Sequence, residues 1–120
     1  MRTSTTARPK RGELWLVRFP FTDLTSAKLR PCLVWATYGQ DVIVLGLFSR
    51  VPTGALQRTW VLVEARHAQF GATGLAQTSL LRAEKIAVIH QSVFRRKLGS
   101  LPQDLMTRAE RAIKAALHLS

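Results

Sequence analysis

Short apolar runs separated by turn-forming residues fill the first three quarters of the chain. Residues 13–19, ELWLVRF, are dense in aromatic and β-branched side chains and predict a strand, which ends at Pro20 because proline has no N–H to donate. Residues 42–48 are apolar almost throughout, which is typical of a central strand covered on both faces. Further strands are predicted at residues 32–36 and 58–63, with short strand pieces at 80–81 and 86–89 and an irregular segment at 66–77.

The hydrophobic period changes near the C-terminus. Leu105, Ala109 and Ile113 recur at helical spacing and predict an amphipathic helix. Ser100 is expected to be its N-cap, with Gln103 three residues later as in a capping box. The whole pattern predicts a mostly β fold with a C-terminal helix, in which the helix caps a small, strongly bent antiparallel sheet or barrel.

The length and charge of the chain limit the number of domains and the kinds of partner it can have. Its 120 residues suit one domain, predicted at 11–120, behind a basic and acid-free stretch at 1–10 that reads as a flexible arm. Eighteen Lys and Arg against seven Asp and Glu give a formal net charge of +11, which favours polyanionic partners such as nucleic acid, an anionic membrane surface or an acidic protein segment. The single cysteine, Cys32, excludes an internal disulfide framework. No apolar run is long enough to span a bilayer and no secretory signal is visible, so we expect a cytoplasmic protein that inserts in no membrane.

Three stretches carry a family resemblance. They are RGELWLV at 11–17, KLRPCLV at 28–34 and the tail from residue 79 to 105, which includes KLGSL at 97–101. Together they resemble the PemK/MazF-type toxins of bacterial type II toxin–antitoxin systems. The resemblance implies an SH3-like barrel of the MazF/CcdB type with a terminal helix, assembled as a homodimer. It also implies sequence-selective cleavage of single-stranded RNA to 2′,3′-cyclic phosphate and 5′-hydroxyl ends, with no metal or cofactor, and inhibition by an acidic antitoxin.

The resemblance places the catalytic arginine at Arg30, immediately before Pro31. A cleaving phosphodiester gathers negative charge on its non-bridging oxygens, and the guanidinium fork can hold two of them. Pro31 restricts the preceding residue to extended geometry, which fixes the backbone of Arg30. Without the resemblance, the same residue would be read as an ordinary surface arginine at a loop end.

The second catalytic position departs from the family. Aligned without a gap, the threonine that the family carries at the end of the third strand falls at Phe48, and the next residue is Ser49. Side chains alternate across a strand, so Ser49 should point away from the threonine's position unless the backbone bulges. Three interpretations stay open: Ser49 replaces the threonine through a kink, cleavage proceeds without that hydroxyl, or activity is lost and RNA binding is kept. In the last case Phe48 stacks on a base, although a core or interface phenylalanine is an equally good interpretation.

Four further residues are candidates for RNA binding. Phe21 and Lys28 belong to a polar loop at 21–29, where basic and aromatic side chains together suit a single-stranded groove. Ser79 resembles a hydroxyl near the family's groove, and Gln91 follows the last long strand, where it could read a base edge. The ordinary alternatives are a loop or core phenylalanine, a strand-end serine and a solvated glutamine.

Other polar residues form no predicted site. The histidines at 67, 90 and 118 show no spacing that would bring two of them together as an acid–base pair, and they make no metal-binding pattern. The basic run Arg95-Arg96-Lys97 either lengthens the RNA path or is a solvated face.

The leading function is therefore a toxin endoribonuclease in which Arg30 stabilises the phosphate and Ser49 supports the phosphate or the 2′-hydroxyl. No residue is assigned as general base. The main alternative is a non-catalytic RNA- or antitoxin-binding member of the same fold, motivated by Phe48. A gyrase poison of the CcdB type is less favoured, because the chain ends in His118-Leu119-Ser120 without a C-terminal aromatic residue.

Overall fold

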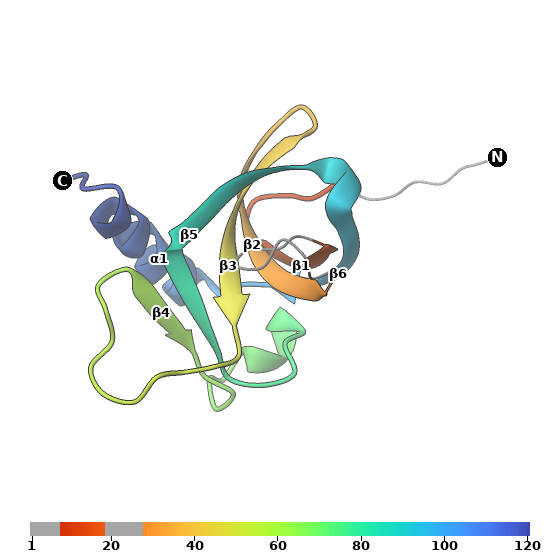
Figure 1. The fold of residues 1–120 in the computed structure, drawn as a ribbon. Coiled ribbons are helices and arrows are strands. Elements are labelled where there is room, and N and C mark those ends of the chain that lie inside the picture. The colour runs from red at the N-terminus through yellow and green to blue at the C-terminus, as the bar shows by residue number, and fades with distance from the viewer. Residues whose placement is uncertain (1–7, 19–27) are drawn as a thin grey trace.

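The computed structural model describes residues 8–18 and 28–120. Six antiparallel strands form one strongly bent sheet in the order β4-β5-β3-β2-β1-β6, with a helix packed against it (Figure 1). The strands are β1 Glu13–Arg18, β2 Leu29–Tyr38, β3 Asp41–Phe48, β4 Trp60–Val63, β5 Ser79–His90 and β6 Phe94–Ser100; the helix is α1 Gln103–Ala116, and 3-10 helices span Phe70–Thr73 and Gln91–Val93. The predicted mostly β fold with a C-terminal helix is confirmed, as an open sheet whose edge strands are β4 and β6.

Both faces of the sheet are buried, because alternate residues of the central strands enter two different clusters. Leu33 and Leu45 belong to the larger cluster, which the apolar face of α1 covers. Cys32 and Val44 belong to a smaller cluster inside the bend of the sheet, where Trp15 is also buried. Residues 42–48 therefore lie at the centre of the sheet, covered on both faces as predicted.

Apart from shifts of a few residues at the ends of β2 and β4, three sequence-based predictions differ from the structure. Ser100 is not the N-cap of α1, because it is the last residue of β6 and Pro102 occupies the cap without a side-chain hydrogen bond. The pieces at 80–81 and 86–89 form one strand, β5, since a register shift opposite Leu45 and Gly46 absorbs the polar residues between them. The basic run lies in β6, an edge strand in which charged residues face solvent and leave no apolar pattern to read.

The N-terminal residues that the structure describes lie against the domain. Pro9 is buried, and the backbone N–H of Lys10 donates to Oε1 of Glu13 at 2.9 Å. Of the arm predicted at 1–10, residues 1–7 lie outside the described part. Within that part, no helix has the length and apolar character needed to cross a bilayer.

The segment 66–77, predicted to be irregular, contains a 3-10 helix and is fastened at two points. His67 Nε2 lies 2.9 Å from Oδ2 of Asp104 in the first turn of α1. Farther along, Gly74 has φ +71° and lies so close to β6 that a Cβ there would be 2.0 Å from the carbonyl oxygen of Leu98. A Cβ at Gly99, in β6, would likewise be 2.1 Å from the carbonyl oxygen of Ala72. Only glycine fits at either position, and the segment is held against β6 and the helix.

The contact between His67 and Asp104 predicts an acid-sensitive contribution to stability. The hydrogen bond with His67 holds the pKa of Asp104 below its usual value. A carboxyl with a lowered folded-state pKa stabilises the fold above its unfolded-state pKa, and this contribution is lost as the pH falls through the folded-state value. We expect Asp104→Asn to lower the unfolding free energy at neutral pH and to approach the wild type between about pH 5 and pH 2, as measured by denaturant titration. Glu110→Gln, which alters an exposed pair with Lys114, is the control, and a pH-independent Asp104→Asn difference would contradict the prediction.

Candidate active site

A pocket of about 330 Å³ lies where the ends of several strands meet. Antiparallel pairing brings the start of β2 beside the end of β3, and the start of β5 beside the same end. The other wall comes from β1, β6 and the end of the segment 66–77. The lining residues are Leu16, Leu29, Arg30, Pro31, Leu47, Ser49, residues 74–77, Ser79, Arg96 and Leu98. We refer to this cavity as the Arg30 pocket.

Three of the predicted site residues meet in the Arg30 pocket. Arg30 lines it from the start of β2, Ser49 from the position after β3 and Ser79 from the start of β5. Arg30 is half-buried and Ser49 is exposed, so both can reach a ligand. The residues are up to 49 positions apart in the chain, and the antiparallel register alone brings them together.

Ser49, and not Phe48, occupies the pocket. Alternation along β3 gives Leu47 and Ser49 a common side, and both line the cavity. The register shift between β3 and β5 lies upstream, at Leu45 and Gly46, so the backbone has no kink at Phe48, and Ser49 lines the pocket from the side of β3 opposite the ring of Phe48. The ring of Phe48 faces the guanidinium of Arg82 at 5.5 Å from its centroid.

Ser79 has a structural hydrogen bond within the pocket wall. It is 4% exposed, and its hydroxyl donates to the carbonyl oxygen of Gln77 at 2.9 Å. The neighbouring Thr78 hydroxyl accepts from the backbone N–H of Ala65 at 2.8 Å. The hydroxyls of Ser79, predicted near the groove, and of its neighbour Thr78 thus hold the wall in place, and Ser79 donates its one proton to Gln77.

The remaining candidates lie elsewhere. Lys28 is exposed and adjoins Leu29 at the pocket edge, whereas Gln91 lines a separate cavity of about 370 Å³ together with His90. Phe21 lies outside the described residues. The structure therefore separates Gln91 from the Arg30 pocket, because the whole of β5 lies between them.

Arg96 and Gln77 line the pocket without having been selected from the sequence. The basic run 95–97 is evident in the sequence, but three adjacent charges do not indicate which of them faces the pocket. The pairing of Arg96 with Leu16 across β6 and β1 supplies that information. Gln77 comes from the irregular segment, where no periodicity exists to place it.

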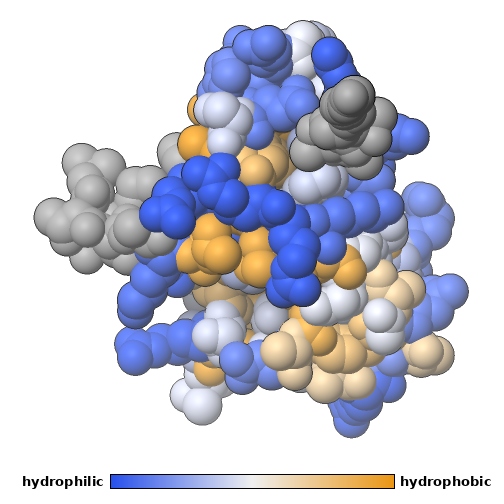
Figure 2. Space-filling model, turned by 90° about the vertical axis from the view of Figure 1, so that its right-hand side faces the viewer, coloured by the Kyte–Doolittle hydropathy of each residue, from blue (hydrophilic) through white to orange (hydrophobic). Residues whose placement is uncertain are grey.

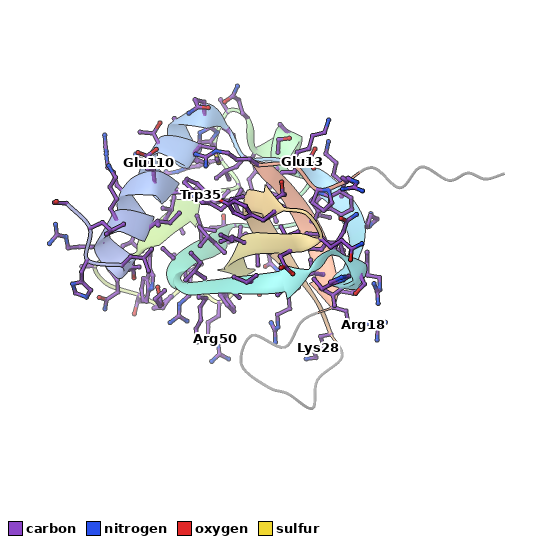
Figure 3. All side chains as sticks on the ribbon, turned by 90° about the horizontal axis from the view of Figure 1, so that it is seen from above. Glu13, Arg18, Lys28, Trp35, Arg50 and Glu110 are labelled. Carbon is purple, nitrogen blue, oxygen red and sulfur yellow. The ribbon has the colours of Figure 1, made fainter. Side chains whose placement is uncertain are left out.

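The pocket is a cationic site. No Asp or Glu lines it, and among the described residues no acidic side chain forms an ion pair with Arg30 or Arg96. Arg18, Lys28 and Arg50 point to one side of the molecule (Figure 3). On the side where β1 and β6 lie, hydrophilic side chains surround a smaller hydrophobic area (Figure 2).

The nearest acidic side chain of β1 already has partners. Glu13 accepts from the indole N–H of Trp15 at 2.9 Å and pairs with Lys97 at 3.0 Å. Burial raises the pKa of this carboxyl, but the hydrogen bonds from Trp15, the Lys10 backbone and Lys97 outweigh it and hold the pKa below its usual value. Glu13 is thus charged and holds β6 through Lys97. The guanidinium groups of Arg30 and Arg96 and the hydroxyl of Ser49 line the Arg30 pocket and suit an anionic ligand such as a phosphodiester.

Within residues 8–18 and 28–120, no three His, Cys, Asp or Glu side chains gather in a way that could hold a metal ion.

Comparison with known proteins places the chain by sequence and by fold. A family model described as PemK-like, MazF-like toxin of type II toxin–antitoxin system matches residues 10–117. Among curated proteins no sequence matches significantly. The Mycobacterium tuberculosis toxin MazF-mt6 is 20% identical, with a TM-score of 0.71 over 90% of this chain and 98% of that one. An endoribonuclease in complex with its cognate antitoxin, from a mycobacterial species, is 21% identical with a TM-score of 0.69 over 93% and 97% of the chains. MazF in a MazE–MazF structure from Deinococcus radiodurans is 16% identical with a TM-score of 0.70 over 96% and 100%.

Proposed function

Because this chain belongs to the family of PemK-like and MazF-like toxins of type II toxin–antitoxin systems, we propose that the Arg30 pocket cleaves single-stranded RNA and thereby inhibits growth. The observation that carries the proposal is the meeting of Arg30, Ser49 and Arg96 in one cavity whose lining contains no carboxylate. Such a cavity suits a phosphodiester and the charge that develops on it during cleavage. Similar folds in an endoribonuclease and in MazF toxins support the same activity.

The proposed reaction is an internal transfer at phosphorus. The 2′-hydroxyl loses its proton and attacks the adjacent phosphate, the bond from phosphorus to the 5′-oxygen breaks, and the leaving 5′-oxygen takes up a proton from water. The products are a 2′,3′-cyclic phosphate and a 5′-hydroxyl. The guanidinium of Arg30 holds the non-bridging oxygens and donates a hydrogen bond toward the leaving oxygen, and Ser49 donates to the phosphate. Arg96 holds a flanking phosphate, while the base that accepts the 2′-proton is left unassigned.

The test is cleavage of a long mixed-sequence RNA by purified protein in EDTA, followed by mapping of the product ends. We expect cuts at a short shared motif that leave 5′-hydroxyl ends. Products with 5′-phosphates would contradict the mechanism. Intact RNA that still binds the folded protein would favour the non-catalytic alternative.

The assembly proposed with this activity is a homodimer that an acidic antitoxin inhibits. The net charge of +11 and the cationic pocket favour an acidic segment as inhibitor. A similar mycobacterial endoribonuclease was solved in complex with its cognate antitoxin, and a similar Deinococcus structure contains MazE with MazF, which supports a partner of that kind. Sedimentation of the purified chain measures the dimer, and cleavage assays with added acidic peptides measure the inhibition. The proposed site of action is the cytoplasm.

Ser49→Ala is expected to slow cleavage by about 10- to 100-fold, because one hydrogen-bond donor to the developing charge is lost. The measurement is the single-turnover rate on an RNA that contains the mapped motif. Ser100→Ala, at an exposed position on β6 outside the pocket, should cleave at the wild-type rate. If Ser49→Ala also kept that rate, cleavage would proceed without this hydroxyl.

A further inference from the structure

A guanidinium lies between two aromatic rings on the face of the sheet opposite α1. The Arg82 guanidinium carbon is 5.5 Å from the ring centroid of Phe48 and 5.4 Å from that of Trp60, both within the range of a cation–π contact. Arg82 Nε lies 2.7 Å from Oε2 of Glu84, and the indole N–H of Trp60 donates to the same oxygen at 3.1 Å. Glu84 thus holds the side chains of both Arg82 and Trp60. We call Phe48, Arg82 and Trp60 the aromatic platform.

The register of three strands builds the platform. Arg82 of β5 pairs with Trp60 of β4 on one side and with Gly46 of β3 on the other, so the three positions share a face. Gly46, the partner of Arg82 in β3, carries no side chain. Phe48, two residues beyond Gly46, projects from the same face.

The platform adjoins the Arg30 pocket along β3, because Phe48 stands between the two lining residues Leu47 and Ser49 in the chain. The last pair of the β2–β3 ladder is Cys32 with Gly46, and Arg30 and Phe48 each lie two residues beyond it. Alternation therefore gives Arg30 and Phe48 a common face, while the next residue, Ser49, lines the pocket. The start of β2 and the end of β3 thus present Arg30 and Phe48 on one face of the sheet.

We propose that the aromatic platform is a second RNA subsite, on which bases that flank the cleaved position stack; this proposal rests on the proposed RNA cleavage. Phe48 and Trp60 are half-buried and the side chain of Arg82 is 33% exposed, so the stack is both held and reachable. The charge of Arg82 is already paired with Glu84, which leaves stacking as its contribution. Stacking accepts every base, so this subsite adds affinity without adding sequence selectivity.

Single-stranded RNA is the occupant that the charges favour. The chain carries a net charge of +11, and Arg50, next to Ser49, points to the same side of the molecule as Lys28 (Figure 3). A polyanion that spans the pocket and the platform meets these cations, whereas a second copy of the same chain would bring its own positive charge to them.

The experiment measures binding separately from cleavage. The probe is a mixed-sequence 20-nucleotide 2′-O-methyl RNA, whose blocked hydroxyl prevents attack, and the readout is fluorescence anisotropy at fixed salt. Trp60→Leu keeps an apolar side chain but removes the ring, and we expect its dissociation constant to rise about tenfold. Trp60→Phe keeps a ring and should stay within about twofold of the wild type. Tyr38→Leu removes an exposed ring at the far β2–β3 turn and is the matched control, expected to bind as the wild type.

If Trp60→Leu bound the 2′-O-methyl RNA with wild-type affinity, the proposed role of the aromatic platform would be wrong, whatever the result of the cleavage assay. Reduced affinity in Trp60→Leu from a chain that cuts no RNA would support the platform and contradict the proposed cleavage. An altered sedimentation coefficient in Trp60→Leu with unchanged RNA affinity would assign the surface to contacts between copies and also overturn the proposal. The near-wild-type binding of Trp60→Phe, together with its unfolding curve, separates loss of stacking from loss of fold.

Discussion

Replacement of Arg30 by alanine is expected to abolish RNA cleavage and the growth arrest that follows from it, while the domain stays folded. Arg30 is half-buried at the start of β2, belongs to neither hydrophobic cluster and lines the pocket with Ser49. Its guanidinium supplies the fork that holds developing charge on phosphorus, and loss of such a donor costs about 10²- to 10³-fold in rate, with loss of its charge adding to this. The measurements are the single-turnover cleavage rate and growth after induction.

Two matched variants make the Arg30 result specific. Arg30→Lys keeps the charge but not the fork, so it should recover only part of the rate. Arg108→Ala removes an exposed arginine from the solvent side of α1 and should cleave as the wild type. A fully toxic Arg30→Ala would show that the Arg30 pocket is not the site of cleavage.

The largest loss of stability is expected from Gly74→Ala, at about 3 kcal/mol. A Cβ there would be 2.0 Å from the carbonyl oxygen of Leu98, so the segment 66–77 would have to move off β6. Its φ of +71° adds the strain of a left-handed residue, about 1 kcal/mol. The measurement is the free energy of unfolding from denaturant titration.

Two other glycines separate the causes of that loss. Gly39 has φ +60° with nothing within 4 Å of its Cβ position, so Gly39→Ala should cost only the backbone strain of about 1 kcal/mol. Gly71 has neither a close neighbour nor a positive φ, so Gly71→Ala should stay within about 0.5 kcal/mol of the wild type. Equal losses for Gly74→Ala and Gly39→Ala would show that contact with β6 contributes nothing.

The fold was predictable wherever burial leaves a period in the sequence. Residues 42–48 show a central strand because both of their faces are covered, and Leu105 to Ile113 show a helix because one face is. β6 was missed because an edge strand tolerates charge at successive positions. The continuity of β5 was missed because its bulge places polar residues between two apolar pieces.

The candidate site was predictable only in part. Arg30 and Ser49 follow from residue order along the chain, since each sits at a strand end that the resemblance identifies. Arg96 and Gln77 could not be selected, because their place in the pocket depends on the register between strands far apart in the sequence. Gln91 lies in another cavity for the same reason.

The fastening of the segment 66–77 has a consequence for how substrate preference can evolve or be redesigned. Backbone contacts at Gly74 and the hydroxyl of Ser79 hold the pocket wall, so its position does not depend on the exposed side chains of Ala76 and Gln77 between them. Those two positions can accept different functional groups while the proposed cleavage residues on β2 and after β3 stay where they are. A small library at these two sites is therefore the natural starting point for toxins that cut at new RNA sequences.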